Sequence, residues 1–470
     1  MWKTFSYYFI ITILILIKVS YNDGIVIPLK IIDNQNTGLN YIESLLQNQL
    51  YAEIKLGTPE QKVYLSISTG TETFSIESRY INDKFYFHNE SSTHINTDTK
   101  ISFYHERYKS GNIFKDNFYF QKDFDDKKYY IFNDISFNYI YELSEEFTNS
   151  EKKFFIDKNK NELSGKIGLQ ISKSYLSSSN FLNSLIYINA IESDIWSIIF
   201  TKEKNNQAYL IIGEDLFIYY NSEKKYTSAY LSGIDSYWHF YFCDIITGSM
   251  KLNKERIAEY APQLGVIVGT EEYKNYINNN FFVNLTKENI CVQKNISFNK
   301  EIYSYYECDK NININNFEPI IFTHQELSYN FTLDKNDLFI DYNNKKYFLC
   351  IFLEKDNSYN SNGEKHWMLG IPFIRKYNFV FDNGIKKIYF YENEYEYEKQ
   401  GKMGWFVWVL IIALATFTAL LGLYLLFKII YRPKRINANE LEDSFNIQKN
   451  AKEDVDLGSF YNSKYNKLGV

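Results

Sequence analysis

The residues best placed to do chemistry lie at the end of a predicted β-hairpin near the N-terminus. Apolar and polar residues alternate over 51–56 and again over 63–68, and the Gly-Thr-Pro-Glu sequence at 57–60 between them is typical of a tight turn. The second strand ends at Ser68, which Thr69-Gly70 follows. A serine hydroxyl in this position can share hydrogen bonds, but near pH 5 it cannot act as a base.

The order of this hairpin resembles the first active-site hairpin of the pepsin family of aspartic proteases. Both have an aromatic residue, an alternating strand, Gly-Thr-Pro, a second alternating strand and then x-Thr-Gly. In that family x is a catalytic aspartate, whereas here it is Ser68. The resemblance continues from about residue 48 to 395. It implies a mostly β, bilobal fold, with lobes at 48–215 and 216–395 related by a pseudo-two-fold axis.

Further landmarks of the pepsin family follow in the expected order. Residues 102–116 match the flap hairpin in spacing, with Tyr104 at the flap tyrosine and His105 in place of a flap glycine. Residues 164–169 resemble the hydrophobic-hydrophobic-glycine loop beneath the first active-site turn. The most specific match is 367–382, where WMLG, FIR and VFD stand at the family's spacing. In the family, this Leu-Gly turn and Phe-x-Arg helix support the second catalytic loop.

The resemblance places the second catalytic motif within 261–270 (APQLGVIVGT), with Ala261 at the aspartate position. No aspartate occurs from 34 to 82 or from 245 to 308, so no change of the alignment within these windows places an aspartate in either motif. Catalysis of the pepsin type needs two carboxylates that share one proton. We therefore expect a family member that has lost both catalytic aspartates.

Other residues near the two motifs offer weak substitutes. Glu72 and Glu259 would each have to reach back from a different point of the backbone, and a solvated glutamate is the ordinary interpretation. His105 and Ser68 form a second conceivable pair, because histidine can serve as a base, but no carboxylate is in place to orient it. The six His and four Cys show no close metal-ligand spacing, so we expect neither a metal nor a cofactor.

Composition agrees with a large β-rich protein. A chain of 470 residues with 45% hydrophobic content can bury a sizeable core. Its 43 Tyr and 38 Phe favour strands, although a bias in codon usage also accounts for them. The net charge of −6 gives no reason to expect a nucleic-acid partner.

The N-terminal residues predict export. Residues 1–20 place Lys3 ahead of an apolar core, as in a secretory signal peptide, with a retained anchor as the alternative. Residues 21–47 then form an N-terminal or pro-like segment. In it, 26–30 (VIPLK) resembles the first strand of a pepsin-family prosegment, which crosses the cleft and sets a basic residue against the catalytic aspartates. A simple N-terminal sheet strand is the alternative.

The C-terminal residues predict a membrane anchor. Residues 405–427 contain no charge over 23 residues, enough for a helix to cross about 30 Å of hydrocarbon. Basic residues follow at 428–435 and place that end in the cytosol. The prediction is a type I single-pass protein with a lumenal or extracellular ectodomain, a linker at 396–404 and a cytosolic tail at 428–470.

The cysteines and sequons fit an oxidising, exported environment. Cys308 and Cys350 match the second-lobe disulfide of the pepsin family, and Cys243 and Cys291 remain as a second bridge or as free thiols. Glycosylation is expected at the four N-x-S/T sequons, Asn89, Asn284, Asn295 and Asn330.

The leading functional hypothesis is a membrane-anchored pseudoprotease. Its interlobe cleft binds an extended peptide or protein segment by strand-type pairing without cutting it. The competing hypothesis is an active membrane-anchored aspartic endopeptidase that works through displaced groups. A third possibility is a structural ectodomain with a collapsed cleft.

Overall fold

The computed structural model describes most of the chain between Gly24 and Tyr391. The described ranges are 24–32, 40–47, 50–78, 86–102, 108–121, 129–143, 163–171, 180–200, 207–214, 225–229, 238–252, 256–298, 301–324, 326–354 and 367–391, with scattered residues between 416 and 430. The predicted signal peptide, Tyr104 and His105 of the flap, and nearly all of the predicted anchor and tail lie outside them. Among the described residues, no helix is long and apolar enough to cross a membrane.

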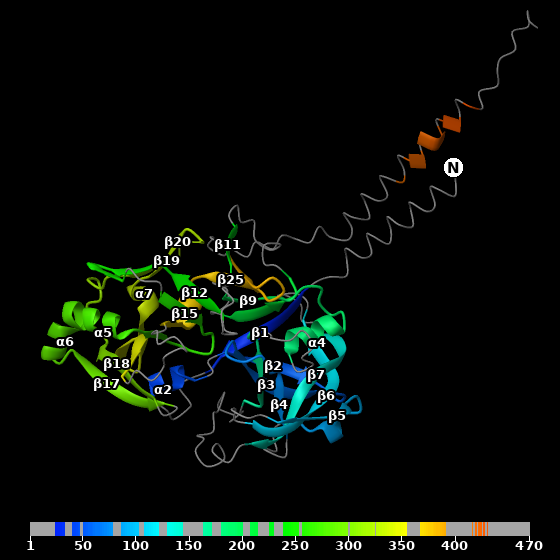
Figure 1. Cartoon of the computed structure of the whole chain (residues 1–470), viewed down its shortest axis with the longest axis horizontal. Helices are drawn as coiled ribbons and strands as arrows, with labels where there is room; N and C mark the ends of the chain where they lie inside the picture. The colour runs from blue at the N-terminus through cyan, green and yellow to red at the C-terminus, as the bar shows by residue number, and fades with distance from the viewer. Residues whose placement is uncertain are drawn as a thin grey trace, which may run out of the picture. The chain divides into compact units, whose positions relative to one another are not determined.

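The largest sheet of the described residues contains strands from β1, early in the chain, to β26 (Figure 1). Its 13 strands run in the order β11-β26-β25-β9-β10-β1-β2-β3-β8-β4-β7-β6-β5, with a further β2–β6 pairing. The strands are β1 (Ile25–Ile31), β2 (Leu50–Leu56), β3 (Gln61–Ser68), β4 (Ser75–Glu77), β5 (Ile95–Ser102), β6 (Tyr108–Phe120), β7 (Tyr130–Leu143), β8 (Gly165–Gly168), β9 (Ile195–Phe200), β10 (Ala208–Ile212), β11 (Lys225–Ala229), β25 (Asn378–Asp382) and β26 (Lys387–Tyr391).

A second sheet carries the other half of the predicted site. Nine strands are described in it, in the order β12-β15-β24-β16-β23-β18-β22-β21, with β17 paired to β18. They are β12 (His239–Phe242), β15 (Arg256–Tyr260), β16 (Ile267–Gly269), β17 (Cys291–Phe298), β18 (Glu301–Asp309), β21 (Phe339–Tyr342), β22 (Lys345–Phe348), β23 (Cys350–Leu353) and β24 (Trp367–Leu369). A smaller sheet holds β14 (Met250–Leu252), β13 (Asp244–Thr247), β19 (Ile320–His324) and β20 (Tyr329–Leu333), in that order.

The described helices are short and lie between strands. They are α2 (Tyr41–Leu45), η2 (His88–Glu90), α4 (Phe181–Tyr187), α5 (Glu271–Ile277), η4 (Asn278–Phe282), α6 (Val283–Lys287), α7 (Lys335–Leu338) and α8 (Ile371–Ile374). The prediction of a mostly β fold is therefore confirmed. The predicted active-site hairpin is β2 and β3, which pair from Tyr51–Ser66 to Leu56–Gln61.

The disulfide prediction is wrong. The bond joins Cys291 to Cys308, and Cys350 is a buried free thiol. Cys291 and Cys308 are directly opposite each other in the β17–β18 hairpin, with their Cα atoms 3.9 Å apart, whereas Cys350 lies on β23 opposite Ile267. Strand register therefore sets the pairing of the cysteines. The spacing match to the pepsin family gave no information on this register. Cys243 is a partly exposed free thiol.

The four sequon asparagines all lie on the surface. Asn89 is in η2, Asn284 in α6, Asn295 on β17 and Asn330 on β20, and each is exposed. Glycosylation at these positions stays a prediction.

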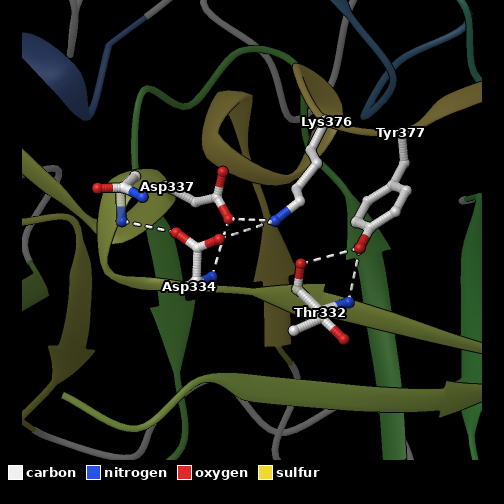
Figure 2. A network of polar contacts seen from close by, with 6 residues as sticks. Thr332, Asp334, Asp337, Lys376 and Tyr377 are labelled. Carbon is white, nitrogen blue, oxygen red and sulfur yellow. Dashed lines mark hydrogen bonds and ion pairs between the residues drawn. The ribbon is translucent and has the colours of Figure 1, made fainter. Parts of the chain in front are cut away.

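A polar network fixes the chain just after α8 (Figure 2). Lys376 Nζ lies 2.6 Å from Asp337 Oδ2 and 3.5 Å from Asp334 Oδ2, and the two aspartates form a capping box at the start of α7. The hydroxyl of Tyr377 donates to the carbonyl oxygen of Thr332 at 2.8 Å and accepts from its N–H at 2.6 Å. The Tyr377 hydroxyl is thus a hydrogen-bond partner for both the N–H and the C=O of Thr332 on β20.

We expect Tyr377→Phe to lower the free energy of unfolding by about 1–3 kcal/mol, because it leaves the backbone N–H and C=O of Thr332 without this partner. Urea denaturation measures the change. Tyr187→Phe, which alters an exposed tyrosine of the domain, is the control. Equal stability of the two variants would contradict the prediction.

Candidate functional site

The loops that follow β3 and β15 meet. Thr69, in the first loop, is buried and donates its hydroxyl to the carbonyl oxygen of Tyr260 at 2.7 Å. Tyr260 directly precedes Ala261, so this hydrogen bond brings the Ser68 and Ala261 positions to one place. In the second loop Pro262 stands where Thr69 stands in the first, and proline has no hydroxyl or N–H with which to form the reciprocal bond.

The first loop rests on β8. Ser68 is opposite Gly168 in a parallel pairing, and the N–H of Leu169 donates to the carbonyl oxygen of Ser68 at 2.8 Å. A Cβ atom on Gly168 would lie 2.4 Å from the carbonyl oxygen of Thr71, so only glycine allows the loop to pass this closely. The hydroxyl of Ser68 accepts a hydrogen bond from the N–H of Gly70 at 3.2 Å.

The second loop repeats this arrangement on β24. The N–H of Ala261 donates to the carbonyl oxygen of Leu369 at 3.0 Å, and the carbonyl oxygen of Ala261 accepts from the N–H of Leu264 at 3.0 Å. A Cβ atom on Gly370 would lie 2.1 Å from the carbonyl oxygen of Val266. Gly370 thus allows a close backbone approach to the second loop, as Gly168 does for the first. This correspondence is the internal duplication expected from the sequence.

Four aromatic side chains support both loops from below. Phe381 stacks on Trp196 with ring centroids 4.2 Å apart and lies 4.9 Å from Trp238 and 4.6 Å from Tyr260. The indole N–H of Trp238 donates to the carbonyl oxygen of Leu169 at 3.0 Å, which ties this cluster to the first loop. The backbone around the two loops is therefore packed closely on a buried aromatic cluster.

A family model for eukaryotic aspartyl proteases matches residues 49–392, which include both loops and their supports. The chain belongs to the eukaryotic aspartyl protease family. No curated protein matches the chain.

The residues that the sequence resemblance assigns to the two dyad positions are Ser68 and Ala261. Ser68 is half-buried and Ala261 is fully buried. No cluster of three or more His, Cys, Asp or Glu that could hold a metal ion occurs among the described residues. His105 lies outside those residues, so its pairing with Ser68 stays a prediction.

Glu259 is the carboxyl group nearest in sequence to Ala261. Ala258 and Tyr260 face the main core, so strand alternation places Glu259 on the same face as Ala261, opposite Met368 on β24. Burial raises the pKa of Glu259 to about 7. Among the described residues, no second carboxylate contributes to this shift, as one would in a proton-sharing dyad.

The raised pKa of Glu259 has a consequence for stability. Above the ordinary pKa of 4.5, the unfolded chain loses this proton while the folded protein keeps it up to about pH 7. The contribution of Glu259 to stability is then highest below pH 4.5 and falls as the pH rises toward 7, by up to about 3 kcal/mol.

We expect Glu259→Gln to remove this part of the pH dependence and to raise the stability at pH 7.5 relative to the wild type. The measurement is the urea midpoint at pH 5 and pH 7.5. Glu288→Gln, at an exposed glutamate, is the control. A pH dependence that Glu259→Gln leaves unchanged would contradict the assignment.

Glu72, the other predicted substitute, lies in the first loop four residues after Ser68. Its Oε2 atom is buried and forms no hydrogen bond in the described structure. The backbone carbonyl oxygen of Glu72 lies 3.5 Å from the side-chain amide of Asn180. The sequence suggested a solvated Glu72 side chain, but the structure shows its Oε2 atom buried.

The second loop is covered by a segment that sequence reasoning did not single out. Helix α2 and the residue after it contribute Tyr41, Ile42, Leu45 and Leu46 to one buried cluster with Ala261. The N–H of Gly265 donates to the carbonyl oxygen of Leu45 at 2.7 Å. The available signal was an Asn N-cap followed by apolar residues at helical spacing, and α2 is indeed capped by Asn40.

The strand predicted at 26–30 is β1, which pairs with β10 on one side and β2 on the other. Both interpretations of the N-terminal segment, prosegment strand or simple sheet strand, place a strand here. Its basic residue does not approach the site, because Lys30 Nζ pairs with Glu53 Oε2 at 2.8 Å on β2.

Proposed function

We propose that the protein is a catalytically inactive aspartyl protease homologue that serves as a peptide- or protein-binding module. One observation carries this proposal. The two loops that hold the catalytic aspartates in the family are brought together, with their glycine and aromatic supports, yet they present Ser68 and Ala261.

The chemistry of these two residues supports inactivity. A pepsin-type mechanism needs one carboxylate to activate water and a second to polarise the scissile carbonyl. The Ser68 hydroxyl already accepts a hydrogen bond from Gly70, and Ala261 offers only a buried methyl group. Loss of a catalytic unit of this kind costs many orders of magnitude in rate.

A peptide-cleavage assay tests the proposal. Full-length protein is incubated with a diverse peptide mixture from pH 3 to pH 7, beside an active aspartic protease, and the products are read by mass spectrometry. We expect no new termini from this protein. Cleavage that is lost in Ser68→Ala or Glu259→Gln would overturn the proposal in favour of an endopeptidase that uses displaced groups.

We also propose the type I membrane topology that the sequence predicts, with the protease-like domain lumenal or extracellular. Its support is the uncharged run at 405–427 and the basic residues after it. An antibody against a C-terminal tag should reach its epitope only after cells are permeabilised. Labelling of intact cells would contradict this orientation.

A further inference from the structure

The segment before β9 ends in an aspartate that pairs with the residue after β25. Strands β9 and β25 are antiparallel, with Ile195 opposite Asp382 (Figure 1). The ladder continues for one more residue, because the backbone N–H of Asn383 donates to the carbonyl oxygen of Asp194 at 2.8 Å. Asp194 and Asn383 therefore lie opposite each other, at the end of the strand pair that carries part of the aromatic cluster beneath the two loops.

The side chains of Asp194 and Asn383 also meet. The amide nitrogen Nδ2 of Asn383 donates to Asp194 Oδ1 at 2.9 Å. Asn383 is only 4% exposed, and its amide oxygen Oδ1 is buried without a hydrogen-bond partner among the described residues. A buried polar atom without a partner is unfavourable. An ionised carboxylate can only accept hydrogen bonds, so Asp194 in that form has nothing to donate to this oxygen.

A protonated Asp194 supplies the missing donor. A carboxylic acid carries one O–H group and keeps an acceptor oxygen. Asp194 Oδ1 then still accepts from Asn383 Nδ2, while the proton on Asp194 Oδ2 is donated to Asn383 Oδ1. The acid and the amide thus form a ring of two hydrogen bonds, in which each group is both donor and acceptor.

The surroundings of Asp194 favour its protonated form. Burial raises the pKa of Asp194 to about 6, while the amide of Asn383 lowers this pKa and the negative charge of Asp382 raises it. The charged side chains on the described segments beside Asp194 are Glu192, Glu214, Asp382, Lys386 and Lys387. Among them, Asp382 is the residue whose charge shifts the pKa of Asp194.

We propose that Asp194 and Asn383 form a clasp that closes with two side-chain hydrogen bonds at acidic pH and keeps only one of them at neutral pH. The clasp joins β9 to β25 and, through the pairing of β25 with β26, to the last strand described in the domain. These C-terminal strands are therefore held most firmly in an acidic compartment. The clasp is independent of whether the protein binds or cuts peptides.

The direction of the pH effect follows from the raised pKa of Asp194. Below its ordinary pKa of 3.8, the carboxyl group carries a proton whether the clasp is closed or open. Between 3.8 and about 6, only the closed clasp keeps that proton, and above this range neither form does. The contribution of the clasp is thus complete below pH 3.8 and is lost as the pH rises through 6. Between pH 5 and pH 7.5 we expect the closing equilibrium to fall about tenfold.

Hydrogen–deuterium exchange of the full-length protein tests the inference. Amide protection factors, corrected for the intrinsic effect of pH on exchange, are compared at pH 5 and pH 7.5 for peptides that cover 195–200 and 378–391. We expect the protection of both peptides to be about tenfold higher at pH 5. Protection that does not change between these two pH values would overturn the clasp.

Two substitutions of Asp194 separate the ring of hydrogen bonds from burial alone. Asp194→Asn replaces the acid by an amide, which forms the same pair of bonds at any pH, so protection at pH 7.5 should rise to the wild-type level at pH 5. Asp194→Ala removes both bonds, so protection should be low at both pH values. Equal protection in the two variants would show that the ring with Asn383 has no effect, and would overturn the clasp.

Two further variants locate the effect at Asp194. Glu192→Gln, which changes an exposed carboxylate two residues away, is the matched control and should keep the wild-type pH dependence. Asp382→Asn removes the charge that acts on Asp194 and can still accept from the N–H of Ile385, so it should weaken the pH dependence without abolishing it. Loss of the pH dependence in Glu192→Gln would contradict the assignment to Asp194. The peptide-cleavage assay involves none of these residues, so the two experiments can fail separately.

Discussion

Restoring an aspartate at position 261 is expected to destabilise the protein, not to rebuild the enzyme. Ala261 is fully buried in a cluster with Tyr41, Ile42 and Leu45, and an unpaired carboxylate in that setting is costly. We expect Ala261→Asp to lower the free energy of unfolding at pH 7 by about 3–5 kcal/mol. The loss should be smaller at pH 4, because the buried carboxyl group can then be protonated at little cost.

Ser68→Asp is the matched control for Ala261→Asp, because it makes the corresponding change in the other loop. Ser68 is only half-buried, so we expect a loss of about 1 kcal/mol or less. Urea denaturation at pH 4 and pH 7 measures both variants. Similar losses in the two variants would show that the loops are equally able to hold a carboxylate.

A double-mutant cycle connects this prediction to α2. If the cost of Ala261→Asp arises from contact with α2, the cost should shrink in the Ile42→Asp/Leu45→Asp background, where α2 no longer covers the loop. If the changes in the free energy of unfolding are strictly additive, the cost of Ala261→Asp arises from burial against the sheet and not from contact with α2. The cycle therefore separates coverage by α2 from burial by the second lobe.

The second large effect is expected at Gly370. A Cβ atom there would lie 2.1 Å from the carbonyl oxygen of Val266 and 2.5 Å from that of Leu264, and both contacts are with backbone that cannot move aside without shifting the second loop. We expect Gly370→Ala to lower the free energy of unfolding by about 3 kcal/mol or more. Thermal unfolding and urea denaturation both measure it.

Gly384→Ala is the control for Gly370→Ala. Gly384 is exposed, and the nearest atom to an added Cβ is the side-chain oxygen Oδ1 of Asp382 at 3.3 Å, a side-chain contact far looser than the backbone contacts at Gly370. Its effect should lie within about 0.5 kcal/mol of zero. Gly168→Ala, at the equivalent place under the first loop, should resemble Gly370→Ala. A mild effect at both Gly168 and Gly370 would contradict the tight packing of the two loops.

Gly168, Gly370 and the aromatic cluster contact the backbone around the two loops and one another. These contacts do not involve a carboxylate at position 68 or 261. A supporting frame without the two carboxylates is therefore what the proposed binding role leads one to expect.

Much of the fold could be predicted from the sequence because its determinants are local. Period-two alternation and the Gly-Thr-Pro turn indicate the β2–β3 hairpin. The turn at Gly370 and helix α8 were expected from the resemblance of the WMLG and FIR sequences to the pepsin family. The absence of aspartate from 34 to 82 and from 245 to 308 is also a property of the sequence, and it is the basis of the proposed loss of the catalytic pair.

Tertiary structure alone decided the disulfide and the cover over the second loop. Cys291 pairs with Cys308 because strand register sets them opposite each other, and register is fixed by the whole hairpin and its neighbours. Helix α2 is a single turn, too short to be stable by itself, and it forms because its apolar residues meet a buried face with Tyr303, Tyr305 and Tyr347, more than 200 residues away in the sequence. Local patterns thus indicated the β2–β3 hairpin. Contacts between distant segments brought the two loops together and placed α2 over the second one.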